Sequence, residues 1–91
     1  VQHNLRWMSW LEKELRLLNL DFQTSITNFL LIKFPIEKKY NAENAENFLA
    51  SKGILVRGMK VYGLSNYLRV SIGTKEENIK FINELKTFFK K

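Results

Sequence analysis

The stretch Tyr67-Leu-Arg-Val-Ser-Ile-Gly73 decides the fold, because apolar and polar side chains alternate along it. This alternation predicts a β-strand, whose successive side chains point to opposite faces of a sheet. One face carries Leu68, Val70 and Ile72, and the other carries Tyr67, Arg69 and Ser71. The apolar face should pack against helices. Arg69 is therefore expected on the face of the sheet that helices leave uncovered.

A second arginine ends an earlier apolar segment, Ile54-Leu-Val-Arg57, which we predict to be a short strand. In such a strand Leu55 and Arg57 share one side, so Arg57 and Arg69 can converge on the uncovered side of the sheet. A guanidinium group binds carboxylate or phosphate through two parallel hydrogen bonds. The two arginines are therefore the candidate anion-binding residues. The alternative is that each is a solvated surface residue or a partner in a structural ion pair.

Two further strands are expected before these. The run Asn28-Phe-Leu-Leu-Ile-Lys-Phe34 is apolar on both faces, which is typical of a central strand covered on each side. Pro35 ends it, because proline cannot donate to the ladder of hydrogen bonds. Asp21–Thr24 alternates more weakly. Asn28 is either a turn residue or a contact to a ligand, and a loop is expected from Gly58 to Asn66.

Three helices complete the pattern. The first runs from about Asn4 to Leu18, with an apolar stripe of Leu5, Met8, Leu11, Leu15 and Leu18. The second is expected over Asn41 to Lys52, with Asn41 as its N-cap and Gly53 just beyond its end. The third begins after Thr74, where Thr74 and Glu77 form a capping box. The order of elements predicts an α+β two-layer sandwich, with helices on one face of a three- to four-stranded, mostly antiparallel sheet.

The composition bounds the possible functions. With 91 residues, 45% hydrophobic and 26% charged, residues 1–91 are expected to form a single folded domain. The absence of cysteine and the single histidine exclude a disulfide framework and a metal site built from these residues. No catalytic constellation is visible in the sequence. No apolar run reaches the about 18–20 residues that a membrane span needs, so we expect none. The chain begins with Val1 rather than Met, which suggests a piece of something longer.

The formal charge of +6 raises the possibility of a stand-alone module that binds RNA or another polyanion. The basic residues are scattered, however, and the only dense clusters are Lys38-Lys39 and Lys90-Lys91. A further alternative is a dimerisation domain that uses Trp7 and Trp10, which would mark a partner surface if they were exposed.

Four segments, in their order and spacing, resemble the C-terminal part of histidinol-phosphate aminotransferases. They are Asn28-Phe-Leu-Leu-Ile, Phe48-Leu-Ala-Ser-Lys-Gly-Ile-Leu-Val-Arg57, Tyr67-Leu-Arg-Val-Ser-Ile-Gly-Thr74 and Glu77-Asn-Ile. These enzymes are pyridoxal-phosphate-dependent aminotransferases of fold type I. The resemblance extends from about Trp7 to Phe89 and covers nearly the whole chain. Threonine-phosphate decarboxylases and the wider class I/II aminotransferases share the pattern and are the alternatives within it.

The resemblance implies that the chain is the small domain of a longer enzyme. Arg69 matches the arginine that grips the substrate carboxylate across the family. Arg57 matches a second arginine that helps to recognise the phosphate end of histidinol phosphate. Since histidinol phosphate has no carboxylate, both arginines are open to a role at the phosphate. Asn28 matches a family position near the substrate.

The resemblance also implies what the chain lacks. In the family, the lysine that bears the cofactor, the aspartate under the pyridine nitrogen and the cup for the cofactor phosphate all lie upstream, in a large domain. Pyridoxal phosphate is therefore not expected on this chain, and Ser51-Lys52 should not be taken for the cofactor lysine. The fragment alone is expected to be inactive. The full enzyme is expected to be a cytoplasmic homodimer that transfers an amino group between histidinol phosphate and 2-oxoglutarate in histidine biosynthesis, with no nucleic-acid, membrane or metal partner.

Overall fold

The computed structural model describes residues 2–24 and 29–90, and the side chains from residue 5 onward within those ranges. The helices are α1 (Gln2–Leu17), α2 (Ala42–Ser51) and α3 (Lys75–Phe89). The strands are β1 (Asp21–Thr24), β2 (Phe29–Lys33), β3 (Arg57–Met59) and β4 (Leu64–Ser71). Two single turns of 3-10 helix, η1 (Lys38–Tyr40) and η2 (Lys60–Tyr62), lie in the connections.

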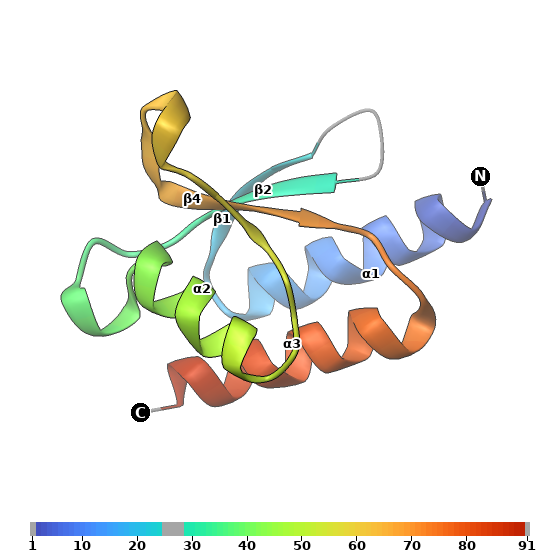
Figure 1. The fold of residues 1–91 in the computed structure, drawn as a ribbon. Helices are drawn as coiled ribbons and strands as arrows, with labels where there is room; N and C mark the ends of the chain where they lie inside the picture. The colour runs from blue at the N-terminus through green and yellow to red at the C-terminus, as the bar shows by residue number, and fades with distance from the viewer. Residues whose placement is uncertain (1, 25–28, 91) are drawn as a thin grey trace.

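The four strands form one sheet in the order β1-β2-β4-β3, and every neighbouring pair is antiparallel. The three helices lie together under one face of this sheet (Figure 1). The predicted α+β class, with helices on one face of an antiparallel sheet, is thereby confirmed. We call the other face of the sheet the open face.

The core lies between the helices and the sheet. Its fully buried side chains include Leu11 and Leu15 from α1, Leu30 and Ile32 from β2, Leu68 from β4, and Leu49, Ile82 and Leu85 from α2 and α3. The predicted stripe of α1 is correct from Met8 onward but wrong at Leu5, which is 67% exposed. The first turn of α1 extends past the ends of the strands (Figure 1).

The end of α2 explains why the predicted strand at residues 54–56 does not form. Gly53 adopts a left-handed φ of 81°, which a residue with a side chain rarely takes. The amides of Gly53 and Ile54 then donate to the carbonyls of Ala50 and Leu49, which closes the helix. Ile54 is thus tied to α2, and β3 begins only at Arg57.

The β3–β4 connection is tighter than the loop expected from Gly58 to Asn66. β3 continues to Met59, η2 follows, and Gly63, with a φ of 76°, turns the chain directly into β4 at Leu64. The pairing between β3 and β4 shifts register between Gly58 and Met59, so the hairpin is irregular. The alternation correctly predicts a strand over Tyr67–Ser71, but β4 starts three residues before Tyr67 and ends two residues before Gly73.

The connection from β4 to α3 is fixed by hydrogen bonds from both sides. Thr74 and Glu77 form the predicted capping box, in which the Thr74 amide donates to Glu77 and the Glu77 amide donates to Thr74. The buried carboxamide of Asn78 accepts from the Gly73 amide at 2.9 Å and donates to the Gly73 carbonyl at 3.1 Å. A Cβ on Gly73 would clash with the Glu77 carboxylate, so a side chain there would displace Glu77 from the capping box.

We expect the substitution Asn78→Ala to lower the free energy of unfolding by about 1–3 kcal/mol, because it removes two hydrogen bonds at a buried position. Asn78 is only 3% exposed, so water cannot replace them freely. Urea unfolding followed by tryptophan fluorescence measures the effect. The matched control is Asn83→Ala, at an exposed asparagine of the same helix, which should change stability by less than about 0.5 kcal/mol. Equal effects of the two substitutions would contradict this role for Asn78.

Candidate functional site

The structure brings Arg57 and Arg69 together on the open face of the sheet. Arg57 of β3 is the direct partner of Arg69 of β4 in the antiparallel ladder. Arg69 is in turn the partner of Leu31 on β2, which is itself the partner of Gln23 on β1. The four side chains form one row across the sheet. Since Gly58 and Leu68, the next pair along, belong to the helix-covered side, both arginines face away from the helices.

Two cations opposite one another in a sheet repel each other. Side chains in this relation have Cβ atoms about 4.5–5.5 Å apart, and like charges there destabilise the pairing. The salt bridges between described residues join Glu12 to Arg16 and Glu14 to Lys86, and neither involves Arg57 or Arg69. Within residues 5–24 and 29–90, therefore, no carboxylate lies within 4.0 Å of either guanidinium group. An anion bound between the two arginines would relieve their repulsion.

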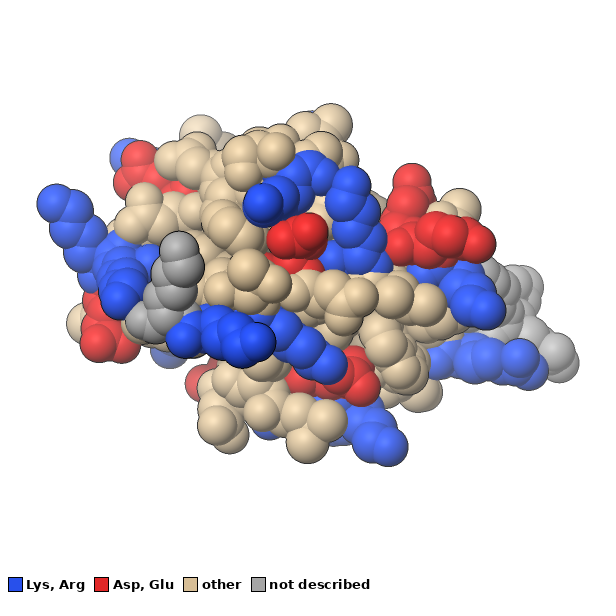
Figure 2. Space-filling model, turned by 90° about the horizontal axis from the view of Figure 1, so that it is seen from below, with Lys and Arg blue, Asp and Glu red and all other residues tan. Residues whose placement is uncertain are grey.

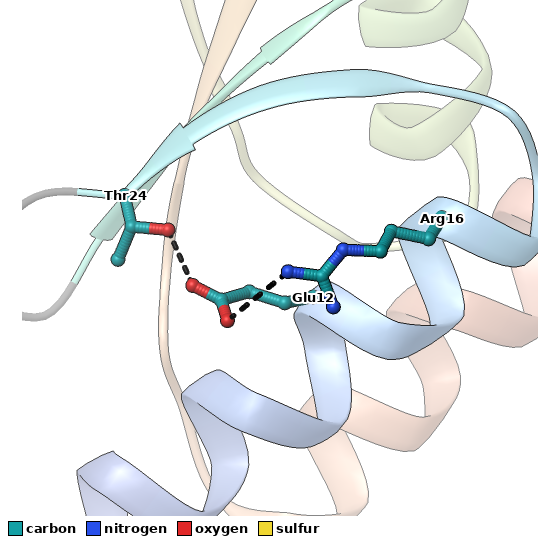
Figure 3. Close-up of polar contacts among 3 residues, drawn as sticks. All are labelled: Glu12, Arg16 and Thr24. Atoms are coloured by element: carbon teal, nitrogen blue, oxygen red, sulfur yellow. Dashed lines mark hydrogen bonds and ion pairs between the residues drawn. The ribbon is translucent and has the colours of Figure 1, made fainter.

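Arg16 shows how a structural arginine of this chain is held. Its guanidinium Nη2 lies 3.9 Å from the Glu12 carboxylate one turn earlier on α1, as the spacing predicts. Glu12 also accepts a hydrogen bond from the Thr24 hydroxyl of β1 (Figure 3). Arg16 is thus part of a contact between helix and sheet. Arg69 has no such carboxylate among the described residues, which argues against the interpretation of Arg69 as an ion-pair partner.

The surroundings of the two arginines differ. Arg69 is half-buried, and its Cζ lies 4.9 Å from the centroid of the Phe29 ring on β2. Arg57 is exposed and borders a surface hollow of about 480 Å³, which is lined by Glu46, Val56, Gly58, Lys60, Val61 and Tyr62. A small anion on the open face would meet a half-buried guanidinium from Arg69 and an exposed one from Arg57.

Sequence reasoning missed or undervalued two neighbours of the arginines. Phe29 was seen only as part of an apolar run, yet its ring lies beside Arg69. Lys33 is paired with Tyr67 across β2 and β4, which adds a third cation to the open face. The alternation along β2 could have indicated this. Phe29, Leu31 and Lys33 share one face of the strand, and they are the partners of Ser71, Arg69 and Tyr67 on the open face. The third predicted site residue, Asn28, lies outside the described residues.

The pair Ser51-Lys52 lies at the end of α2, where both side chains have other contacts. Ser51 and Lys52, which mimic a cofactor-binding Ser-Lys pair, are both exposed at the end of α2. The Ser51 hydroxyl donates to the carbonyl of Phe48 at 2.6 Å, and Lys52 Nζ lies 5.4 Å from the centroid of the Phe48 ring. These residues are engaged in ending the helix and do not fit the cofactor.

The charge on the helix-covered side is mixed. Lysine and arginine side chains are interspersed there with acidic side chains and uncharged surface (Figure 2). The net charge of +6 is therefore not gathered into one basic patch on this side. The part of the chain that the structure describes contains no helix long and apolar enough to cross a membrane.

Comparison with known proteins decides the relationship. The chain is 45% identical over 86 residues to the histidinol-phosphate aminotransferase of Paramagnetospirillum magneticum, which covers 94% of this chain. It is 37% identical over 90 residues to that of Maricaulis maris. The resemblance to histidinol-phosphate aminotransferases is confirmed. The chain spans about a quarter of the length of these curated relatives, at 24% and 25%.

The fold is shared with part of a solved enzyme. L-threonine-O-3-phosphate decarboxylase from Porphyromonas gingivalis superposes with a TM-score of 0.79 and 26% identity, over 99% of this chain and 27% of that one. No protein-family model matches the chain. The similarity to histidinol-phosphate aminotransferases thus rests on whole-chain alignment, and the similarity to the decarboxylase supports the α+β fold of this segment.

Proposed function

We propose that the chain is the substrate-binding small domain of a pyridoxal-phosphate-dependent aminotransferase of the histidinol-phosphate aminotransferase type. The observation that carries the proposal is the pair Arg57 and Arg69, placed side by side on the open face without a carboxylate partner among the described residues. The alignment with histidinol-phosphate aminotransferases over nearly the whole chain supports the same function.

In this proposal Arg69 binds the anionic group of the substrate and orients it. Its position at the centre of the sheet and its contact with Phe29 restrain it, and a restrained guanidinium binds a carboxylate or phosphate with less loss of freedom. Arg57, on the edge strand, contributes a second and more exposed cation. The substrate would be histidinol phosphate, which exchanges its amino group with 2-oxoglutarate. The phosphate of histidinol phosphate suits two adjacent guanidinium groups.

The remaining three quarters of the relatives' length would supply the large domain, the cofactor lysine and the bound pyridoxal phosphate. The cofactor supplies the chemistry of amino transfer, and this chain alone would be inactive. The full enzyme would be a homodimer. The open face supports this division, because Phe29 and Leu31 are apolar and only half-buried there. A second domain over the open face would remove these side chains from water and would close the site around the arginines.

Determining the reading frame upstream of the codon for Val1 and assaying the full-length protein tests this proposal. We expect a large domain with a cofactor lysine, and amino transfer from histidinol phosphate to 2-oxoglutarate. Release of carbon dioxide from threonine phosphate would instead favour the decarboxylase alternative, which the shared fold keeps open. A protein that begins near Val1 and lacks any further domain would contradict the proposal.

The alternative of a polyanion-binding module makes a different prediction. We expect the chain to show no appreciable binding to mixed-sequence RNA at 50 mM salt, because its charges on the helix side are of both signs (Figure 2). Fluorescence anisotropy of a labelled 20-nucleotide RNA measures this. Binding that weakens steeply as salt rises would support the alternative, since contacts to phosphates release counterions.

A further inference from the structure

The contact between Phe29 and Arg69 suggests a role for a third residue, in addition to the two arginines of the candidate site. Phe29 is the first residue of β2 and is paired with Ser71, while Arg69 lies two residues earlier on β4. The guanidinium therefore reaches diagonally across the sheet to lie over the ring, with Cζ 4.9 Å from the centroid. We propose that Phe29 is a positioning residue, whose ring holds the Arg69 guanidinium in the orientation that receives the anion. This inference rests on the proposed function.

The Phe29 ring restrains Arg69 in the way that a carboxylate restrains an arginine elsewhere in the chain. An arginine side chain has about 2 kcal/mol of rotamer freedom, which binding an anion would otherwise have to remove. Arg16 is restrained by the Glu12 carboxylate, but a carboxylate beside Arg69 would compete with an anionic substrate. An aromatic ring attracts the cation through its face and does not neutralise its charge. Phe29 can therefore restrain Arg69 while the net positive charge stays available.

The contact with the Phe29 ring leaves the N–H groups of Arg69 available to bind an anion. The five N–H groups of a guanidinium lie in its plane and point outward from its rim. The Phe29 ring lies near Cζ, at the centre of the guanidinium group, and offers no oxygen atom to these N–H groups. Bidentate hydrogen bonds to a carboxylate or phosphate use two N–H groups on one edge of the rim. The ring and the anion can consequently be accommodated together.

The ring of Phe29 does little for the core. The core cluster and the apolar side chains packed against it include Phe22, but among the described residues they do not include Phe29. Phe29 lies on the open face and is only half-buried. A phenylalanine at this position is thus better explained by its contact with Arg69 than by burial of apolar surface. Phe22 offers a matched comparison, because the Cζ of Arg16 lies 5.3 Å from the centroid of its ring.

A double-mutant cycle in the full-length enzyme tests the inference, with inorganic phosphate as a competitive inhibitor. We expect Phe29→Leu, which keeps an apolar side chain but removes the ring, to weaken phosphate inhibition by about three- to tenfold. The effect should fall on the inhibition constant and on KM more than on kcat. Phe29→Tyr should restore inhibition to within about twofold of the original protein. Phe22→Leu, which removes the same kind of contact from Arg16, should leave phosphate inhibition unchanged.

The Arg69→Ala background separates positioning from a general structural effect. If Phe29 acts through Arg69, adding Phe29→Leu to Arg69→Ala changes phosphate inhibition no further. Independent, additive effects of the two substitutions would overturn the inference. If Arg69→Ala weakens inhibition but Phe29→Leu does not, the positioning role fails and the proposed function stands. If Arg69→Ala itself leaves inhibition unchanged, both the inference and the proposed function are wrong.

Discussion

Replacement of Arg69 by alanine is expected to lower kcat/KM of the full-length enzyme by about 30- to 1,000-fold, which corresponds to roughly 2–4 kcal/mol. The guanidinium would make charge-assisted hydrogen bonds to the anionic group of the substrate, and each is worth about 1.5–3 kcal/mol. Arg69 is half-buried at the centre of the sheet, so water replaces these bonds poorly. Steady-state kinetics with the amino donor varied at saturating acceptor measures the loss.

The controls for Arg69 come from the same chain. Arg6→Ala removes an exposed arginine of α1 and should leave kcat/KM within about twofold of the original value. Arg57→Ala should lower kcat/KM less than Arg69→Ala, because Arg57 is exposed and lies on the edge strand. Arg69→Lys keeps the charge but loses the bidentate fork, so it should recover only part of the activity. An unchanged kcat/KM for Arg69→Ala would remove Arg69 from the site.

Features that depend on neighbouring residues in the chain could be predicted from the sequence. The capping box of Thr74 and Glu77, the N-cap at Asn41 and the left-handed Gly53 are all present where the sequence places them. Each is a contact within one turn of a helix end, so the local sequence contains its cause. The alternation along β4 likewise gave the correct face for Arg69, because the period of a strand does not depend on its partners.

Features that depend on how the chain packs in three dimensions could not be predicted. The segment at 54–56 has the pattern of a strand, but its backbone follows the end of α2 instead. Asn78 is a polar residue on a helix, and nothing in its neighbourhood shows that it is buried against Gly73. Leu5 fits the helical period of α1 but is 67% exposed. In each case the local pattern is compatible with two outcomes, and the packing of the folded chain decides between them.

The candidate site shows the same division. The sequence could predict that Arg57 and Arg69 share a face, but not that they are direct partners, because register is a property of two strands. It could not predict the contact between Arg69 and Phe29, which joins strands forty residues apart in the chain. The absence of a carboxylate partner for Arg69 among the described residues also required the structure. This observation weighs against the ion-pair alternative, which the sequence left open.

The largest expected effect on stability comes from Leu15 of α1. We expect Leu15→Ala to lower the free energy of unfolding of this chain by about 3 kcal/mol, since it removes three buried carbons and leaves a cavity. Leu15 is 0% exposed and belongs to the core cluster between helices and sheet. For a domain of this size the melting temperature should fall by roughly 15 °C. The experiment also tests whether the chain folds alone, as the apolar stripes of its helices predict.

Leu17, two residues further along α1, provides the control because it is 68% exposed. Leu17→Ala should change the free energy of unfolding by no more than about 0.5 kcal/mol. Urea unfolding can be followed by the fluorescence of Trp7 and Trp10, which are half-buried on α1 with ring centroids 5.2 Å apart. A cooperative transition for the unaltered chain, with a much earlier midpoint for Leu15→Ala alone, is the expected result. Absence of a cooperative transition in the unaltered chain would show that the core between helices and sheet requires a covering domain on the open face to be stable.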